Sequence, residues 1–340
     1  MRQTRSWGRS AGVLGIGLGV IGASVMMRAP RDAAFTRDPV IGDVIAAESG
    51  QSSTSLDQSL TGAGLGPEWD LPNLDHPRID YWVDRFQHVP EMREKFEGFL
   101  ERGAEWAPLI LERLDARGMP LDLLYLAMIE SGFNPSATSH ASAVGIWQFM
   151  PPTGQQYGLA IDRAVDERRD PVRATEAALD YLEVLHRRFG SWYLASAAYN
   201  SGEGRVGRAM RQQYGRQKAR SEQEYYRIWN RLPAETRDYV PLMIAAARIT
   251  KDPAAFGFEP MKLTPRHWEE VTVPPATPLE VIAELIGATV AEIRDLNPHF
   301  LLNRTPNNRD YAVRLPLGSL PRLAGAEFLG GTSRSSEVAE

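Results

Sequence analysis

Apolar residues recur at three- and four-residue steps in two long stretches of the chain, which places them on one face of a helix. In residues 91–118 these positions are Phe96, Leu100, Trp106, Ile110 and Leu114. In residues 174–189 they are Ala177, Tyr181, Leu185 and Phe189. Gly190 follows the second stretch and is expected to end its helix. A third stretch, residues 238–250, is apolar enough to predict a buried helix.

The pattern changes near the C-terminal end. No strand pattern occurs before about Val271, so the first domain is predicted to be all-α. After Pro260, residues 269–273 and 310–316 read as short strands. Between them, Thr277–Glu280 and Thr289–Glu292 read as capping boxes that each open a short helix. The predicted fold class is therefore mainly α, with an all-α domain followed by a small α+β module of βααβ order.

Composition divides the chain into five segments. Residues 1–30 place a basic flank before an uncharged run, the pattern of a signal peptide or an N-terminal membrane anchor, so the rest is expected to be exported. Residues 31–67 are rich in Ser, Thr, Gly and Gln and are predicted to be a flexible linker. The first domain is predicted over 68–258, the module over 259–320 and a disordered tail over 321–340.

Overall charge and missing residue types exclude several function classes. The chain has 340 residues and a formal net charge of −5, which argues against a nucleic-acid partner. It has no cysteine, which excludes disulfides, thiol nucleophiles and cysteine-based metal sites. Its six histidines never occur at metal-ligand spacing, and there is no phosphate loop or G-x-S-x-G motif. We therefore expect neither a metal nor a cofactor.

One carboxylate stands at the end of an apolar run. Leu123 and Leu126 lie seven and four residues before Glu130, so all three are expected on one apolar helix face. Burial of Glu130 would raise its pKa, as a general acid requires. Alternatively, Glu130 is an ordinary polar residue at a helix end, hydrogen-bonded to local backbone.

No charged residue follows between Ser131 and Ile161. Hydroxyls, amides and aromatic rings fill this stretch instead, Gln148 among them, and such groups suit an uncharged polyhydroxylated ligand such as a sugar chain. The stretch lacks periodicity and is predicted to be a long loop with short helical pieces. The alternative is a loop that only packs on its own domain.

Two further clusters carry polar side chains at helix ends. Tyr199 and Asn200 end an Ala-rich helix before a glycine-containing turn, where they could bind a ligand or a catalytic carboxylate. Glu235 and Tyr239 lie four residues apart on one helical face. Either cluster could instead serve only its helix, through a cap or through a favourable charge in the first turn.

Taken in order, these motifs resemble a known family. "ES" at Glu130, "GIWQ" ending at Gln148, "AYN" ending at Asn200 and "ETRDYV" from Glu235 resemble the ordered motifs of the soluble-lytic-transglycosylase domain, a goose-lysozyme-like all-α fold. The resemblance covers roughly residues 81–250. Residues 117–159 and 232–241 are especially similar to the D-type membrane-bound lytic murein transglycosylases. The C-terminal module resembles a degenerate LysM domain, a fold that binds glycans containing N-acetylglucosamine.

The resemblance implies a function and a set of site residues. Glu130 would be the sole catalytic acid and base, acting on peptidoglycan strands between N-acetylmuramic acid and N-acetylglucosamine. The muramic C6 hydroxyl would attack its own C1 and leave a 1,6-anhydro end. The implied substrate-binding or supporting residues are Ser131, Gln148, Tyr199, Asn200, Glu235 and Tyr239.

Two departures from the family pattern affect location and binding. The chain lacks the cysteine that often carries a lipid in related enzymes, so we expect it in the periplasm, released or held at the membrane by the N-terminal segment. It carries a single weak LysM-like copy, which does not imply strong glycan binding on its own. We expect a monomer.

Two rival functions are considered beside this one. In a true hydrolase of the lysozyme type, Asp162, Asp166 or Glu235 would activate a water molecule, because ordinary glycosidases need a second carboxylate. In a non-catalytic protein that binds the cell wall, the fold would serve only as a scaffold.

Overall fold

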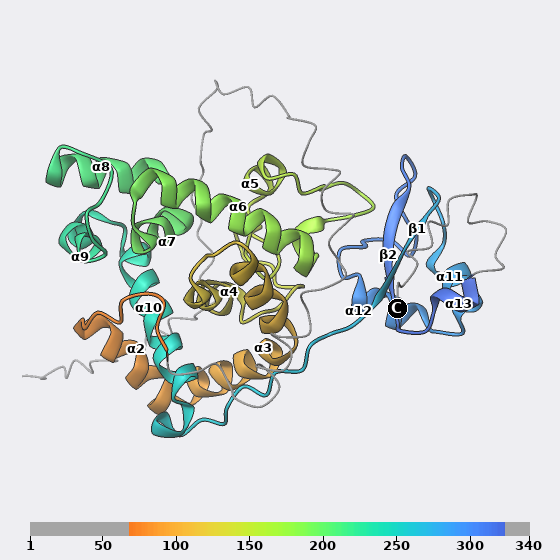
Figure 1. Cartoon of the computed structure of the whole chain (residues 1–340), viewed down its shortest axis with the longest axis horizontal. Helices are drawn as coiled ribbons and strands as arrows, with labels where there is room; N and C mark the ends of the chain where they lie inside the picture. The colour runs from red at the N-terminus through yellow and green to blue at the C-terminus, as the bar shows by residue number, and fades with distance from the viewer. Residues whose placement is uncertain (1–67, 324–340) are drawn as a thin grey trace, which may run out of the picture.

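The computed structural model describes residues 68–323 (Figure 1). The predicted signal or anchor, the linker and the tail beyond residue 323 lie outside these residues. Within them, no helix is long and apolar enough to span a membrane. The first domain contains α2 (Pro77–His88), α3 (Pro90–Ala116), η1 (Leu121–Leu123), α4 (Leu124–Ser131), α5 (Pro151–Gln156), η2 (Glu167–Arg169), α6 (Pro171–Phe189), α7 (Trp192–Ser201), α8 (Glu203–Tyr214), α9 (Glu224–Ile228), η3 (Trp229–Arg231), α10 (Ala234–Lys251) and η4 (Pro253–Phe256).

The three predicted helices are confirmed as α3, α6 and α10. In α3 the apolar residues at helical spacing are buried, with Phe96 and Ile110 fully inaccessible. Helix α6 begins after Asp170, whose side chain accepts hydrogen bonds from the first-turn N–H groups, and ends at Gly190 in the left-handed region with φ of 64°. A glycine adopts that conformation without steric cost, which explains the end of the helix.

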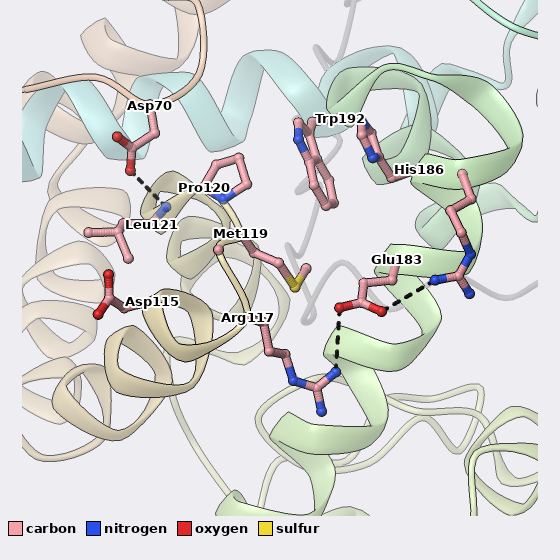
Figure 2. A pocket seen from close by; sticks show the side chains of 11 residues that line it. Asp70, Asp115, Arg117, Met119, Pro120, Leu121, Glu183, His186 and Trp192 are labelled. Atoms are coloured by element: carbon pink, nitrogen blue, oxygen red, sulfur yellow. Dashed lines mark hydrogen bonds and ion pairs between the residues drawn. The ribbon is translucent and has the colours of Figure 1, made fainter. Parts of the chain in front are cut away.

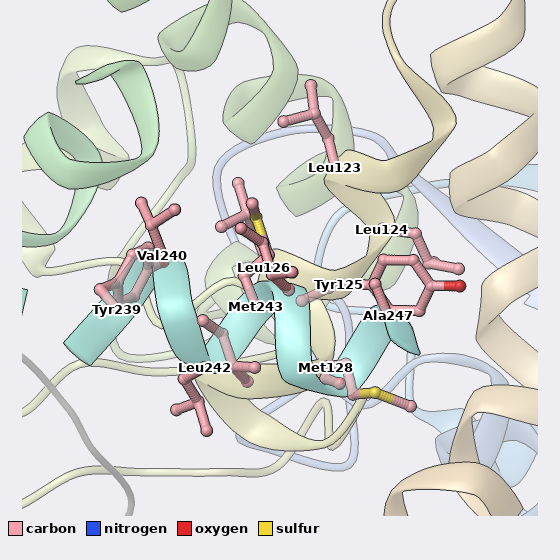
Figure 3. Close-up of a cluster of buried hydrophobic side chains, with 14 of the residues drawn as sticks. Leu123, Leu124, Tyr125, Leu126, Met128, Tyr239, Val240, Leu242, Met243 and Ala247 are labelled. Atoms are coloured by element: carbon pink, nitrogen blue, oxygen red, sulfur yellow. The ribbon is translucent and has the colours of Figure 1, made fainter. Parts of the chain in front are cut away.

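Helix α4 lies at the centre of the domain. All of its residues from Leu124 to Glu130 are buried, and a helix that is apolar all round must be surrounded by protein. Helix α10 packs along it, and Figure 3 shows Leu126 of α4 and Met243 of α10 in one cluster. Leu123 was expected to share a helix with Glu130, but it lies in the 3-10 turn η1 because the chain enters α4 through that turn after Pro120.

The packing of five helices brings distant segments together. Helix α10 contacts α2, α4 and α7, and α7 contacts α6. The C-terminal ends of α4 and α7 carry Glu130 and Asn200, and the first turn of α10 carries Glu235. Three helix ends that are far apart in sequence therefore supply the residues of one site.

The C-terminal module has the predicted α+β order. Strands β1 (Glu269–Val273) and β2 (Tyr311–Leu315) pair antiparallel, with Val271 opposite Val313. Helices α11 (Leu279–Ile286), α12 (Val290–Leu296) and α13 (Leu320–Leu323) cover them. The module has its own hydrophobic core and lies at the opposite end of the molecule from α8 and α9 (Figure 1). The predicted fold class is confirmed.

One of the two predicted capping boxes is present. Thr289 and Glu292 bond each other's backbone N–H groups at the start of α12. Thr277 makes no such bond, because α11 begins only at Leu279 and Pro278 occupies the cap position. The Thr277 hydroxyl donates to the Pro274 carbonyl instead, which ties the loop before the helix.

Candidate active site

Glu130 occupies the last turn of α4. The helix ends at Gly132, which has φ of 60° in the left-handed region. Only glycine fits at this position, because a Cβ atom there would lie 2.0 Å from the Phe99 ring. The Glu130 residue is only 5% exposed, as the apolar run predicted. The Tyr239 hydroxyl donates a hydrogen bond of 2.5 Å to its Oε1 atom. Glu130 is therefore held by a side chain of α10 rather than by the local backbone of its own helix end.

The surroundings of Glu130 favour its protonated form. Burial raises the pKa of its carboxyl to about 8; the bond from Tyr239 lowers the pKa in part, and the nearby charge of Glu235 raises it. A carboxyl group with this pKa is mostly protonated at neutral pH. It can donate a proton to a leaving oxygen and then accept one as a carboxylate, which are the two tasks of a general acid and base.

Removing the Tyr239 hydroxyl should raise the pKa of Glu130 further. Tyr239→Phe deletes the one interaction that lowers this pKa, so we expect a value above about 8. Carbon-13 NMR titration of labelled glutamate carboxyls measures it, with the signal assigned by its loss in Glu130→Gln. Tyr199→Phe is the control because the Tyr199 hydroxyl donates to the Trp147 carbonyl at 2.8 Å and not to Glu130. A Glu130 pKa that falls in Tyr239→Phe would contradict the assignment.

Asn200 links the ends of α7 and α10. Its Oδ1 atom accepts a hydrogen bond of 2.8 Å from the Thr236 hydroxyl, and its Nδ2 atom lies 3.4 Å from Glu235 Oε1. Asn200 is buried, whereas Glu235 and Tyr199 are half-buried. Asn200 and Glu235 are thus bonded to each other, and the charge of Glu235 in turn raises the pKa of Glu130. Thr236, which donates to Asn200, belongs to the "ETRDYV" motif but was not predicted as a site residue.

Gln148 is presented by a tightly closed part of the acid-free loop. Val144 and Phe149 exchange two backbone hydrogen bonds of 3.1 Å, and Gln148 between them has φ of 49°, rare for a residue other than glycine. Its amide donates to the Gly145 carbonyl at 2.8 Å, while its buried Oε1 atom has no hydrogen-bond partner. A strained backbone together with an unpaired buried acceptor is typical of a ligand-binding position.

Ser131 connects Glu130 to this loop. Its hydroxyl donates to the Ile146 carbonyl at 2.8 Å and accepts a hydrogen bond from the backbone N–H of Asn134 at 3.1 Å. The residue next to Glu130 therefore ties the end of α4 to the segment that carries Gln148. These contacts give Ser131 a supporting position.

The aromatic rings of the loop are part of the core and not of an open surface. Trp147 is fully buried, and its indole N–H donates to the Thr175 hydroxyl at 2.9 Å. Phe149 is 2% exposed. The expectation that such rings face a sugar is wrong for these two residues, because the loop folds its apolar side chains onto α6 and α7.

The three carboxylates that could activate water in a hydrolase lie in different places. Asp166 forms a buried ion pair with Arg168, and Asp162 caps the backbone N–H groups of Ala164 and Val165. Asp162 and Asp166 are thus already bonded within the segment before α6, whereas the charge of Glu235 raises the pKa of Glu130. Within residues 68–323, no cluster of three or more His, Asp or Glu side chains is arranged to hold a metal ion.

A separate pocket of about 700 Å³ lies at the other end of α4 (Figure 2). It is lined by the turn from Arg117 to Leu121, by α6 near His186 and by Trp192 at the start of α7. None of the predicted site residues lines it. Its charged groups largely bond one another, as Arg117 does with Glu183, so this pocket is not the candidate active site.

Two family models match the chain. Residues 109–221 match the Transglycosylase SLT domain, and residues 267–327 match the LysM-like domain of lytic transglycosylase MltD. The first match contains the predicted site residues from Glu130 to Asn200, whereas Glu235 and Tyr239 lie beyond its end. The resemblance of both parts of the chain is thereby confirmed.

Similar proteins and structures share parts of the chain. It is 33% identical over 247 residues to membrane-bound lytic murein transglycosylase D of Escherichia coli strain K12, covering 69% of this chain and 53% of that protein. It is 35% identical over 116 residues to peptidoglycan transglycosylase gp16 of Escherichia phage T7, covering 33% and 9%. The lytic transglycosylase Slt of Pseudomonas aeruginosa aligns with 45% of this chain and 24% of its own, at 24% identity and a TM-score of 0.35. The chain thus spans about half the length of the E. coli relative.

Proposed function

Since the chain combines a transglycosylase SLT domain with the LysM-like domain of lytic transglycosylase MltD, we propose that it is a peptidoglycan lytic transglycosylase. The observation that carries this proposal is the buried carboxyl of Glu130, whose pKa of about 8 suits a proton donor at neutral pH. A non-catalytic wall-binding protein needs no such group, because burying a carboxyl group costs free energy.

In the proposed reaction, Glu130 acts twice. Its proton passes to the glycosidic oxygen between N-acetylmuramic acid and N-acetylglucosamine while the bond from that oxygen to C1 breaks. The Glu130 carboxylate then takes the proton of the muramic C6 hydroxyl as its oxygen bonds to C1. The product carries a 1,6-anhydro ring, no water is consumed, and Glu130 ends protonated as it began.

This reaction explains how one carboxyl group suffices. A glycosidase that uses water or a covalent intermediate needs a second carboxylate. The acid-free stretch from Ser131 to Ile161 supplies none, and an intramolecular hydroxyl replaces it through high effective molarity.

The remaining site residues are proposed to hold the sugar or to orient Glu130. Gln148 offers its unpaired Oε1 atom to a substrate hydroxyl or amide, and Asn200 lies between Glu235 and Thr236. Tyr239 orients the acid through its hydrogen bond. Tyr199 and Ser131 brace the loop through the carbonyls of Trp147 and Ile146.

Mass spectrometry of digested murein sacculi tests the proposal. We expect fragments that end in 1,6-anhydromuramic acid, with no gain of water at the cleaved bond. Digestion with a muramidase is the reference for reducing ends. Reducing ends as the main product would instead favour the hydrolase, with Glu235 activating water, since this carboxylate is near enough to Glu130 to raise its pKa.

The proposed substrate sets the location. Peptidoglycan lies outside the cytoplasmic membrane, so the enzyme is proposed to act in the periplasm, exported or anchored by the N-terminal segment. That segment lies outside the described residues. Comparing the protein in membrane and soluble periplasmic fractions would separate anchoring from release.

A further inference from the structure

The C-terminal module is docked on the segment that precedes α6. Val165 of this segment is fully buried in the hydrophobic core of the module. Its neighbours form backbone hydrogen bonds with the module, from Asp166 N to His299 O at 2.9 Å and from Leu301 N to Ala164 O at 2.8 Å. The segment is therefore bonded to the module through an isolated antiparallel β-bridge between Val165 and Phe300, and it is not a free linker.

Buried polar contacts strengthen this docking. Nη2 of Arg314 on β2 lies 2.9 Å from both carboxylate oxygens of Asp170, which is completely inaccessible. The Tyr311 hydroxyl donates to Glu167 at 2.7 Å. Burial raises the pKa of Asp170, but the charge and hydrogen bond of Arg314, together with the charges of His299 and Arg173, lower it by more in sum, so the net shift is downward. Removing Arg314 takes away one cation beside this buried carboxylate and leaves it with Arg173 and two first-turn N–H groups of α6.

The same segment also holds the loop that carries Gln148. The guanidinium of Arg168 donates through Nη1 to the carbonyls of Ser142 and Phe149 at 2.8 and 3.0 Å. Its Nε and Nη2 atoms donate to the Asp166 carboxylate at 2.9 and 2.8 Å. These bonds span the base of the loop on both sides of Gln148. One 3-10 turn, η2, thus lies between the module and the loop.

We propose that the LysM-like module is a structural part of the active site, with Arg168, Tyr311 and Arg314 as positioning residues. Tyr311 and Arg314 hold the two ends of η2 in place. Arg168 of η2 in turn holds the backbone on either side of Gln148 through its hydrogen bonds. This inference rests on the proposed function for its catalytic consequence. The mechanical coupling of the module to the loop stands on the contacts alone.

Arg314→Met in the full chain tests this coupling. We expect the kcat for murein cleavage to fall about tenfold with little change in KM, because small displacements of a site lower catalysis more than binding. Hydrogen exchange should accelerate at least about tenfold at the amides of Val144, Gly145 and Phe149, which are all hydrogen-bonded in the closed loop. Arg314→Lys should recover part of both losses.

Arg266→Met is the matched control. Arg266 also joins the two domains, through Glu105 of α3 and Asp295 of α12, but it does not contact η2. Its removal should leave kcat and loop exchange within about twofold of the unchanged protein. An equal acceleration in both variants would overturn the proposal, because it would show general loosening.

Tyr311→Phe keeps the test decisive if Arg314→Met fails to fold. It removes a single hydroxyl and should accelerate exchange of the same amides by a smaller factor. Loop exchange unchanged in Tyr311→Phe and in any folded Arg314 variant would overturn the inference. If the unchanged protein cleaves no murein, the proposed function fails, while the exchange measurements still decide whether the module orders the loop.

Discussion

Glu130→Gln is expected to lower murein cleavage by about 10³-fold while binding to sacculi survives. Glutamine keeps the shape of the side chain and can still accept the hydrogen bond from Tyr239, but its amide is too weak an acid to protonate a leaving oxygen. Release of soluble fragments from labelled sacculi measures turnover, and co-sedimentation measures binding. Equal turnover in the two proteins would end the assignment of Glu130 as the acid.

The same variant should be more stable than the unchanged protein at neutral and alkaline pH. Because the pKa of Glu130 is raised from 4.5 to about 8, the stabilising effect of its protonated form is complete below about pH 4.5 and is lost as the pH rises to about 8. Glutamine cannot ionise and escapes this loss, which amounts to about 3 kcal/mol at pH 7.

Thermal unfolding at two pH values checks this second effect. The melting temperatures of the two proteins should coincide near pH 4.5 and diverge by several degrees near pH 8, with the variant higher. A gap that is constant across this range would show that Glu130 is not a buried titrating group. If the melting temperatures diverge as expected, activity and stability change in opposite directions at this position, as is common where a site is built for catalysis.

Gly145→Ala is expected to disrupt the loop that presents Gln148. Gly145 has φ of 85°, and a Cβ atom there would lie 1.8 Å from the backbone carbonyl oxygen of Arg168. Neither backbone can give way easily, since Arg168 is held by its own ion pair with Asp166. We expect a loss of about 3–5 kcal/mol in the free energy of unfolding and about 100-fold in cleavage rate.

Gly158→Ala separates the clash from backbone strain. Gly158 has φ of 86°, almost the same as Gly145, but nothing lies within 4 Å of its added Cβ atom. This control should cost about 1 kcal/mol and leave cleavage nearly unchanged. Denaturant unfolding and the cleavage assay compare the two variants. Similar losses in both would show that close packing of the loop on Arg168 is unimportant.

The local pattern of the chain was enough to predict the helices and the burial of Glu130. Apolar spacing predicts a helix from the residues themselves, so α3 and α6 could be recognised directly. Glu130 could be predicted because an ionisable residue inside an apolar run has few ways to avoid burial. The capping box at Thr289 was also readable, whereas the one at Thr277 failed because Pro278 shifts the helix start.

Contacts between distant segments were decided only by the tertiary structure. Tyr239 donates to Glu130 across 109 positions, and the pKa of Glu130 depends on that bond and on Glu235 as well as on burial. Arg168 reads in the sequence as one of two adjacent arginines in a charged run, yet it holds the loop around Gln148. Periodicity reports how a residue faces its own helix, but it carries no information on which other helix end or loop the fold will place against it.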